Sequence, residues 1–260
     1  HAEAYRSLSS CWSGRIYSTT HPHLQTGSSE DLATQSLEDF AAVWAHDIIA
    51  ECKGQRYCLV GASLGGLLAY EVAAAAQSLE APAPRRIFLI DPSPPSMRLG
   101  EVWSPRYAAV TLAMLSAHVE GVAAKLDPPP EAFDVADVAI CLGEFRASLL
   151  GYRCTSQMVK ESLKQLRSAM HMIGLRSDMR SHDAHSRKPF MCHLFFASER
   201  PESGDDGKAA AREHYGGALG FATISSEVEI VGEHMGVCAR CMVGEEDAFN
   251  ATLRDATKLP

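Results

Sequence analysis

One short stretch limits the folds open to this chain more than any other feature. An apolar run over 57–60 leads into a G-x-S-x-G pattern centred on Ser63, and a segment of good helix formers follows. This order predicts a strand, a sharp turn and a helix, with Ser63 at the apex of the turn. A turn this tight strains the serine backbone, and its glycines let neighbouring segments pack close to it. The hydroxyl then stands clear of the sheet, and Leu64 opens the helix with its backbone N–H directed at a developing oxyanion.

Two later motifs supply the partners that a serine nucleophile requires. A serine hydroxyl attacks efficiently only when a base takes its proton and a carboxylate orients that base. Asp91 directly follows the apolar run 87–90, and His234 comes shortly after the run 228–231, in a segment expected to be a loop. The order Ser63, Asp91, His234 is typical of α/β-hydrolases. We therefore predict an α/β-hydrolase fold, with a mostly parallel sheet flanked by helices and a Ser-His-Asp triad at the carboxyl ends of the strands.

The acidic member of this triad has competitors in the sequence. Glu199 follows a further apolar run, 189–198, and many α/β-hydrolases carry their acid after that later strand. Glu199 is therefore an alternative partner for His234. Asp205 and Asp206 are weaker candidates, because their glycine-flanked segment is expected to be a solvated loop.

These motifs resemble those of the thioesterase domains of polyketide synthases, nonribosomal peptide synthetases and animal fatty acid synthases. The resemblance rests on residues 61–71, 89–92 and 232–234, with further similarity at 5–8, 16–17, 21–22 and 36–41. The family places its acid after the earlier strand, which favours Asp91 over Glu199. The resemblance implies an acyl–Ser63 intermediate and a substrate held on the phosphopantetheine of an acyl or peptidyl carrier protein. It implies release by water or by an internal nucleophile of the acyl chain, and no cofactor in the domain itself.

The remaining pattern fits one domain spanning residues 1–260. We expect a short strand at 16–19, helices over about 36–48 and 64–79, and a last helix over about 245–258. Between about 97 and 187 the β/α alternation stops, and helical stretches at 107–119, 135–149 and 157–173 predict a lid inserted over Ser63. The chain starts at His1 without methionine, where the family's first strand and glycine-rich loop would just have ended. The sequence thus indicates a truncated N-terminus that lacks the second oxyanion donor.

Composition excludes several other classes of function. The net charge is −8 and no basic stripe is present, which argues against a nucleic-acid partner. No apolar run approaches the ~20 residues of a membrane-spanning helix. The eight cysteines have the spacing of buried free thiols in a reducing compartment, so we expect a cytoplasmic location. The single C-x-x-C at 238–241 has no second pair to complete a metal site, and no metal is expected.

Two alternative functions remain open from the sequence. One is a stand-alone editing thioesterase or a carboxylesterase, which would use the same three residues. The other is a catalytically degenerate hydrolase fold that serves as a binding module. The presence of all three residues in the expected order speaks against the second alternative.

Overall fold

The computed structural model describes residues 8, 12, 14–19, 37–79, 81–92, 136, 139–140, 143–144, 147, 151–164, 190–199, 204–216 and 222–258. The chain divides into two compact units. The first contains residues 1–19, 36–97 and 178–260, and the second contains 20–35 and 98–177. The second unit overlaps the insertion expected between 97 and 187.

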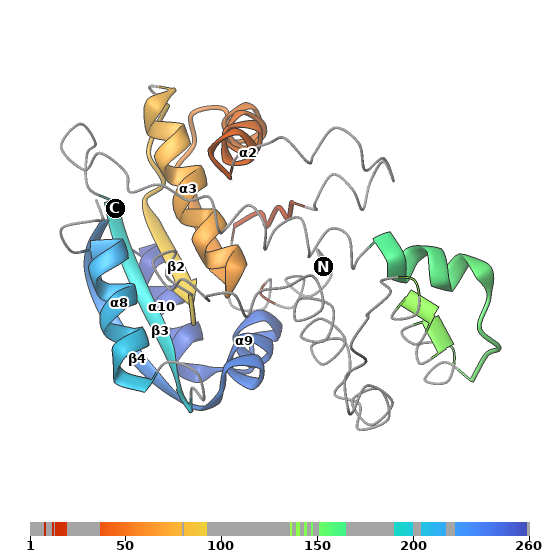
Figure 1. Ribbon diagram of the computed structural model, residues 1–260. Coiled ribbons are helices and arrows are strands. Elements are labelled where there is room, and N and C mark those ends of the chain that lie inside the picture. Colours follow the sequence, from red (N-terminus) through yellow and green to blue (C-terminus); the bar gives the residue numbers. More distant parts are fainter. Residues whose placement is uncertain are drawn as a thin grey trace. The chain divides into compact units, whose positions relative to one another are not determined.

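A parallel sheet forms the centre of the first unit. Its strands are β1 (Cys58–Ala62), β2 (Arg86–Ile90), β3 (Phe190–Glu199) and β4 (Ala222–Glu233), in the order β1-β2-β3-β4. Each neighbouring pair is parallel. Strands β2, β3 and β4 are labelled in Figure 1. Helix α3 (Leu64–Ser78) connects β1 to β2, and α8 (Gly204–Gly216) connects β3 to β4. The sheet and its crossover helices confirm the predicted α/β class.

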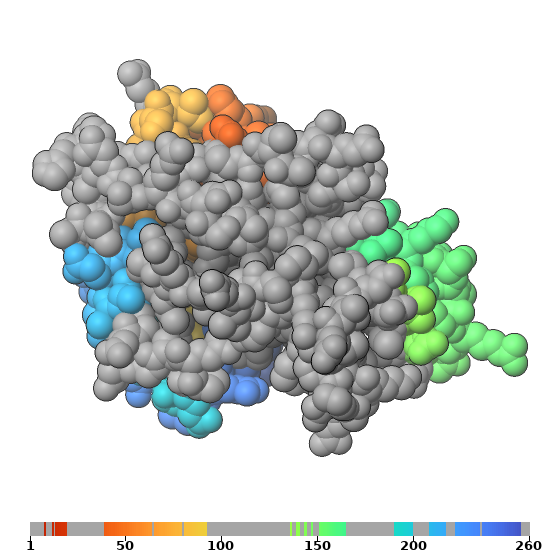
Figure 2. Space-filling view, in the orientation of Figure 1, coloured from red at the N-terminus to blue at the C-terminus, as the bar shows by residue number. Residues whose placement is uncertain are grey.

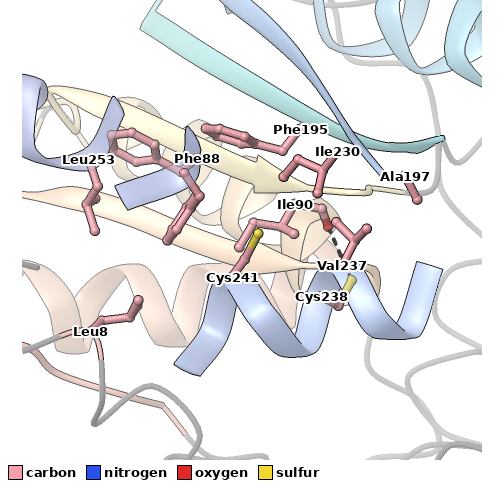
Figure 3. Packing of buried hydrophobic residues seen from close by; sticks show 11 residues of the cluster. Leu8, Phe88, Ile90, Phe195, Ala197, Ile230, Val237, Cys238, Cys241 and Leu253 are labelled. Carbon is pink, nitrogen blue, oxygen red and sulfur yellow. Dashed lines mark hydrogen bonds between the residues drawn. The ribbon is translucent and has the colours of Figure 1, made fainter. Parts of the chain in front are cut away.

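One face of the sheet is covered by α9 (His234–Val243) and α10 (Asp247–Lys258). Phe88 and Phe195 of the sheet make edge-to-face contacts with Phe249 of α10, at centroid distances of 6.3 and 5.2 Å. Figure 3 shows this core, whose buried members are Leu8, Phe88, Ile90, Phe195, Ala197, Ile230, Val237, Cys238, Cys241, Phe249 and Leu253. The packing fixes α9 against the strands that end at the candidate site.

The opposite face carries α3 and α8. Tyr70 of α3 is fully buried and contacts Phe190 of β3 and Tyr215 of α8, with centroids 5.5 and 5.0 Å apart. Helix α2 (Leu37–Cys52) lies beside α3 (Figure 1), and its Phe40 and Ala45 are buried, as its apolar periodicity requires. Helices on both faces explain why the strand segment 87–90 is apolar at every position.

Three local expectations are wrong. Residues 15–19 have no regular secondary structure, although a strand is expected at 16–19. A short apolar stretch becomes a strand only where another strand pairs with its backbone, and the sheet of the described residues contains β1–β4 alone. The segment after β4 is a helix, α9, and not a loop. Asp205 and Asp206 likewise lie in the first turn of α8 instead of a loop.

In the second unit the described residues are helical or irregular, and none of them is in a strand. Residues 156–164 form a helix, and residues 136, 139–140, 143–144 and 147 are helical; both groups are green in Figure 2. The helices expected at 135–149 and 157–173 are therefore confirmed where the structure describes them. The stretch expected at 107–119 lies outside the described residues.

Candidate active site

Ser63 occupies the turn between β1 and α3. Its backbone has φ 53° and ψ −125°, in a region that residues other than glycine rarely adopt. The Ser63 N–H donates to the carbonyl of Ile90 at 2.8 Å, which ties the turn to β2. A Cβ at Gly61 would lie 2.1 Å from the carbonyl oxygen of Gly65, so only glycine fits there. The tight, strained turn expected from the G-x-S-x-G pattern is present.

Asp91 follows the last residue of β2 and is fully buried. Its backbone also has a positive φ, 44°, and its N–H donates to the carbonyl of Phe195 at 2.6 Å. The carboxylate oxygen Oδ1 accepts a hydrogen bond from the N–H of Ala197 at 3.0 Å. The adjacent strand β3 thus fixes both the backbone and one carboxylate oxygen of Asp91, and the other oxygen is directed at His234.

His234 is the first residue of α9, directly after β4. Its Nδ1 is 2.5 Å from Asp91 Oδ2, and its Nε2 is 2.9 Å from Ser63 Oγ. An ionised carboxylate only accepts hydrogen bonds, so Nδ1–H donates to Asp91 and the lone pair of Nε2 accepts the Ser63 hydroxyl. The structure therefore brings the three residues into one hydrogen-bonded chain within one compact unit. The imidazole retains 29 % side-chain exposure, whereas the Asp91 side chain has none.

The competing acids lie elsewhere. Glu199 is the last residue of β3 and has an exposed side chain, whereas the carboxylate bonded to His234 Nδ1 is that of Asp91. Asp205 and Asp206 begin α8 on the opposite face of the sheet from α9.

Leu64 is the first residue of α3, with Ser63 as the N-cap. The N–H groups in the first turn of an α-helix have no carbonyl partner within the helix, and they carry the positive end of the helix dipole. The carbonyl of Ser63 already accepts the N–H of Gly66 at 2.9 Å, as expected for an N-cap residue. The N–H of Leu64 is therefore a donor immediately next to the Ser63 side chain.

The buried cysteines do not compete with Ser63 as nucleophiles. Burial raises the pKa of the Cys192 thiol, and burial, followed by the charge of Glu246, raises the pKa of Cys241 to about 12. Both therefore stay protonated and unreactive near neutral pH. Among the residues that the structure describes, no group of three or more His, Cys, Asp or Glu side chains is placed to hold a metal ion.

Three contacts around the site have no counterpart in the sequence motifs. The N–H of Ala197 holds Asp91, the hydroxyl of Ser198 accepts the N–H of Gly232, and Arg240 donates to the carbonyl of Val231. The location of Ser198 at the carboxyl end of a strand, beside Glu199, is the pattern that would have identified it. Arg240 lies within the C-x-x-C at 238–241, but that pattern gives no indication of its contact with Val231.

The fold is of the α/β-hydrolase type, and Ser63 lies at its strand–turn–helix junction. The family model of the thioesterase domain matches residues 1–102 of the chain, which confirms the resemblance drawn from its motifs. No curated protein matches the sequence at a significant level.

Solved structures of thioesterases share the fold at low sequence identity. RedJ, a thioesterase of the prodiginine biosynthetic pathway in Streptomyces coelicolor, is 19 % identical, with a TM-score of 0.54 over 85 % of this chain and 71 % of RedJ. The NocB thioesterase domain, solved as a covalent complex with a fluorophosphonate nocardicin G analogue, is 16 % identical, with a TM-score of 0.54 over 99 % of this chain and 88 % of NocB. The Vlm2 thioesterase domain, bound with a dodecadepsipeptide, is 16 % identical, with a TM-score of 0.61 over 99 % and 88 %.

None of the helices in the described part of the chain is long and apolar enough to cross a membrane.

Proposed function

We propose that the protein is a serine thioesterase that releases an acyl chain from the phosphopantetheine arm of a carrier protein. The observation that supports this most is the chain of hydrogen bonds from Asp91 through His234 to Ser63, at 2.5 and 2.9 Å. The thioesterase family match over residues 1–102 supports acyl-thioester hydrolysis as the reaction class. The resemblance to polyketide synthase and nonribosomal peptide synthetase domains supports the carrier-bound substrate.

In the first half-reaction, Ser63 Oγ attacks the thioester carbonyl while its proton passes to His234 Nε2. Asp91 stabilises the imidazolium through Nδ1–H and holds the tautomer that leaves Nε2 free to accept. The negative oxygen of the tetrahedral intermediate is stabilised by the N–H of Leu64 at the positive end of α3. When the intermediate collapses, the C–S bond breaks, the thiol leaves with the proton from His234, and an acyl–Ser63 ester remains.

In the second half-reaction, His234 Nε2 removes a proton from the incoming nucleophile. Water yields the free acid, whereas an internal hydroxyl or amine of the acyl chain yields a ring. The nucleophile adds to the ester carbonyl, and His234 returns the proton to Ser63 Oγ as the C–O bond breaks. The three side chains and the Leu64 N–H act identically in both outcomes, so the choice depends on how the acyl chain is held.

The first experiment is labelling with a fluorophosphonate, a reagent that phosphonylates activated serines. We expect one adduct, located on Ser63 by mass spectrometry, and none on Ser63→Ala. A native protein that stays unlabelled supports the alternative of a degenerate binding module. An adduct on another serine contradicts the proposed nucleophile.

The second experiment separates the enzyme classes by substrate. We expect acyl carrier protein thioesters to be turned over with a higher kcat/KM than p-nitrophenyl esters of the same acyl group. The reverse order supports a carboxylesterase. A preference for carrier-bound acetyl over longer chains supports an editing thioesterase instead of a chain-releasing one.

A further inference from the structure

One peptide group just before His234 is held by side chains at both of its polar atoms. It joins Val231 to Gly232, two positions before the histidine. Its carbonyl accepts a hydrogen bond from Arg240 Nη2 at 2.6 Å, and its N–H donates to Ser198 Oγ at 3.1 Å. Ser198 comes from β3 and Arg240 from α9, so side chains of two different elements hydrogen-bond to the same peptide group.

The register of β3 and β4 explains why this peptide is hydrogen-bonded to side chains. Ala197 pairs with Ile230, but Glu199 pairs with Glu233, so two steps along β3 correspond to three along β4. The extra residue makes a bulge, which breaks the ladder of backbone hydrogen bonds and redirects the strand. Gly232, at φ 125°, supplies the backbone geometry that other residues rarely adopt.

The two side chains replace the ladder bonds that the bulge removes. The Gly232 N–H is partly buried and needs a partner, which Ser198 supplies. The Val231 carbonyl is exposed and can bind water, so what Arg240 adds there is a fixed position for the peptide. Arg240 is itself held in place, because its Nε donates to Glu246 Oε2 at 3.2 Å. The guanidinium therefore links the bulge, the body of α9 and the segment that leads into α10.

We propose that Ser198 and Arg240 are positioning residues for His234. By holding the Val231–Gly232 peptide they fix where β4 ends and α9 begins, and hence where the imidazole lies relative to Ser63 and Asp91. The Asp91 carboxylate is positioned by Ala197, the residue before Ser198 in β3, because the N–H of Ala197 donates to Asp91 Oδ1. Consecutive residues of β3 thus place the acid and the base of the hydrogen-bonded chain.

This inference rests on the proposed catalytic role of His234, and the experiment keeps the two apart. The assay is turnover of acetyl-pantetheine, a thioester too short to report on binding of a long acyl chain. We expect Ser63→Ala and His234→Ala to remove activity. If His234→Ala remains active, the proposed function fails, and with it the basis for a positioning role.

With that established, we expect Ser198→Ala to lower kcat about 10- to 100-fold, the loss typical of a slightly misplaced catalytic group, with KM nearly unchanged. Ser198→Thr keeps the hydroxyl and restores kcat. Glu199→Gln, at the adjacent exposed position, is the matched control and leaves kcat unchanged. A native kcat in Ser198→Ala overturns the inference while leaving the proposed function intact.

Arg240 provides an independent test should Ser198→Ala fold poorly, as judged by circular dichroism and thermal unfolding. We expect Arg240→Gln to lower kcat by a similar factor and Arg240→Lys, which keeps one donor for the Val231 carbonyl, to lie between it and the native protein. Because both side chains act on one peptide, the double variant with Ser198→Ala should lose less than the product of the single losses. The positioning role is overturned if activity falls only in proportion to the fraction of protein that is folded. It is also overturned if the variants raise KM and leave kcat unchanged.

Discussion

Asp91 and His234 are 143 positions apart in the sequence, yet Asp91 Oδ2 lies 2.5 Å from His234 Nδ1. The contact is set by backbone geometry at both ends. Asp91 leaves β2 with a positive φ and is hydrogen-bonded to β3 through its own N–H and through Oδ1. His234 enters from β4 through a bulge that is held by side chains. The hydrogen bond is therefore a product of the β2-β3-β4 strand order.

A first prediction concerns the acid. Asp91→Asn replaces an acceptor by a group that can donate, so the histidine tautomer with a free Nε2 is no longer favoured. We expect kcat to fall by about 10⁴-fold, as the equivalent change does in a serine protease triad. Steady-state kinetics on a short acyl thioester measure this. Glu199→Gln, which removes the competing carboxylate, should change kcat by less than about twofold; the opposite ranking would move the acid to the end of β3.

The elements that the sequence predicts well are those with an unbroken local pattern. The apolar runs before Ser63 and Asp91 are recognisable because both faces of their strands are covered, and the glycines around Ser63 reveal the turn. Each of these features arises within about ten residues of sequence. The parallel order of the strands then follows from the alternation of strands and helices.

The features that the sequence does not reveal depend on distant partners. Helix α9 contains Gly236 and begins without a side-chain cap hydrogen bond, so its local sequence is a weak helix predictor. It is helical because Val237, Cys238 and Cys241 pack into the core beneath the sheet (Figure 3). The bulge at Gly232 likewise cannot be predicted from the sequence, because register is a relation between β3 and β4 and not a property of either strand.

A second prediction tests the close packing at the turn. Gly61→Ala would place a methyl group 2.1 Å from the carbonyl oxygen of Gly65, which is backbone and cannot rotate away. We expect a loss of about 3 kcal/mol or more in the free energy of unfolding, at the upper end of overpacking costs. Gly54→Ala is the control, because its added methyl meets nothing within 4 Å although φ is 77°. Its cost should be only the backbone strain, about 1 kcal/mol. Urea unfolding of both variants measures the contrast; equal costs contradict a steric role for Gly61.

A third prediction concerns the expected lid, residues 97–187. Substitutions there should change selectivity among acyl thioesters more than they change turnover of an acetyl thioester, since the short substrate contacts only the reacting groups. Met158→Ala, on the helix 156–164, is the test variant, and the exposed Lys160→Ala is its control. The measurement is the ratio of kcat/KM for a long acyl thioester to that for acetyl. If both substrates slow equally, the segment acts on stability or on the geometry of Ser63 and His234, and the lid hypothesis is wrong.

The last prediction concerns a histidine outside the candidate site. His193, in the middle of β3, is stacked on Phe88 with ring centroids 5.0 Å apart and 11° between the planes. Its Nε2 lies 3.0 Å from Arg86 Nη1, and its Nδ1 lies 2.7 Å from Ser226 Oγ. Arginine only donates hydrogen bonds, so Nε2 must accept and the imidazole must be neutral. Burial, and secondarily the charge of Arg86, lower the pKa of His193 from 6.5 to about 4.

The pH dependence of stability follows from that lowered pKa. Between about pH 6.5 and pH 4 the unfolded chain takes up a proton at His193 that the folded chain does not. Stability is therefore highest above this window and falls as the pH is lowered through it, by an amount of order 3 kcal/mol from this group. His193→Gln, whose side-chain oxygen can still accept from Arg86, cannot titrate. Urea unfolding of both proteins at several pH values across the window measures the difference. We expect the native protein to lose more stability than His193→Gln as the pH falls; parallel curves would show that His193 is protonated equally in the folded and unfolded chains.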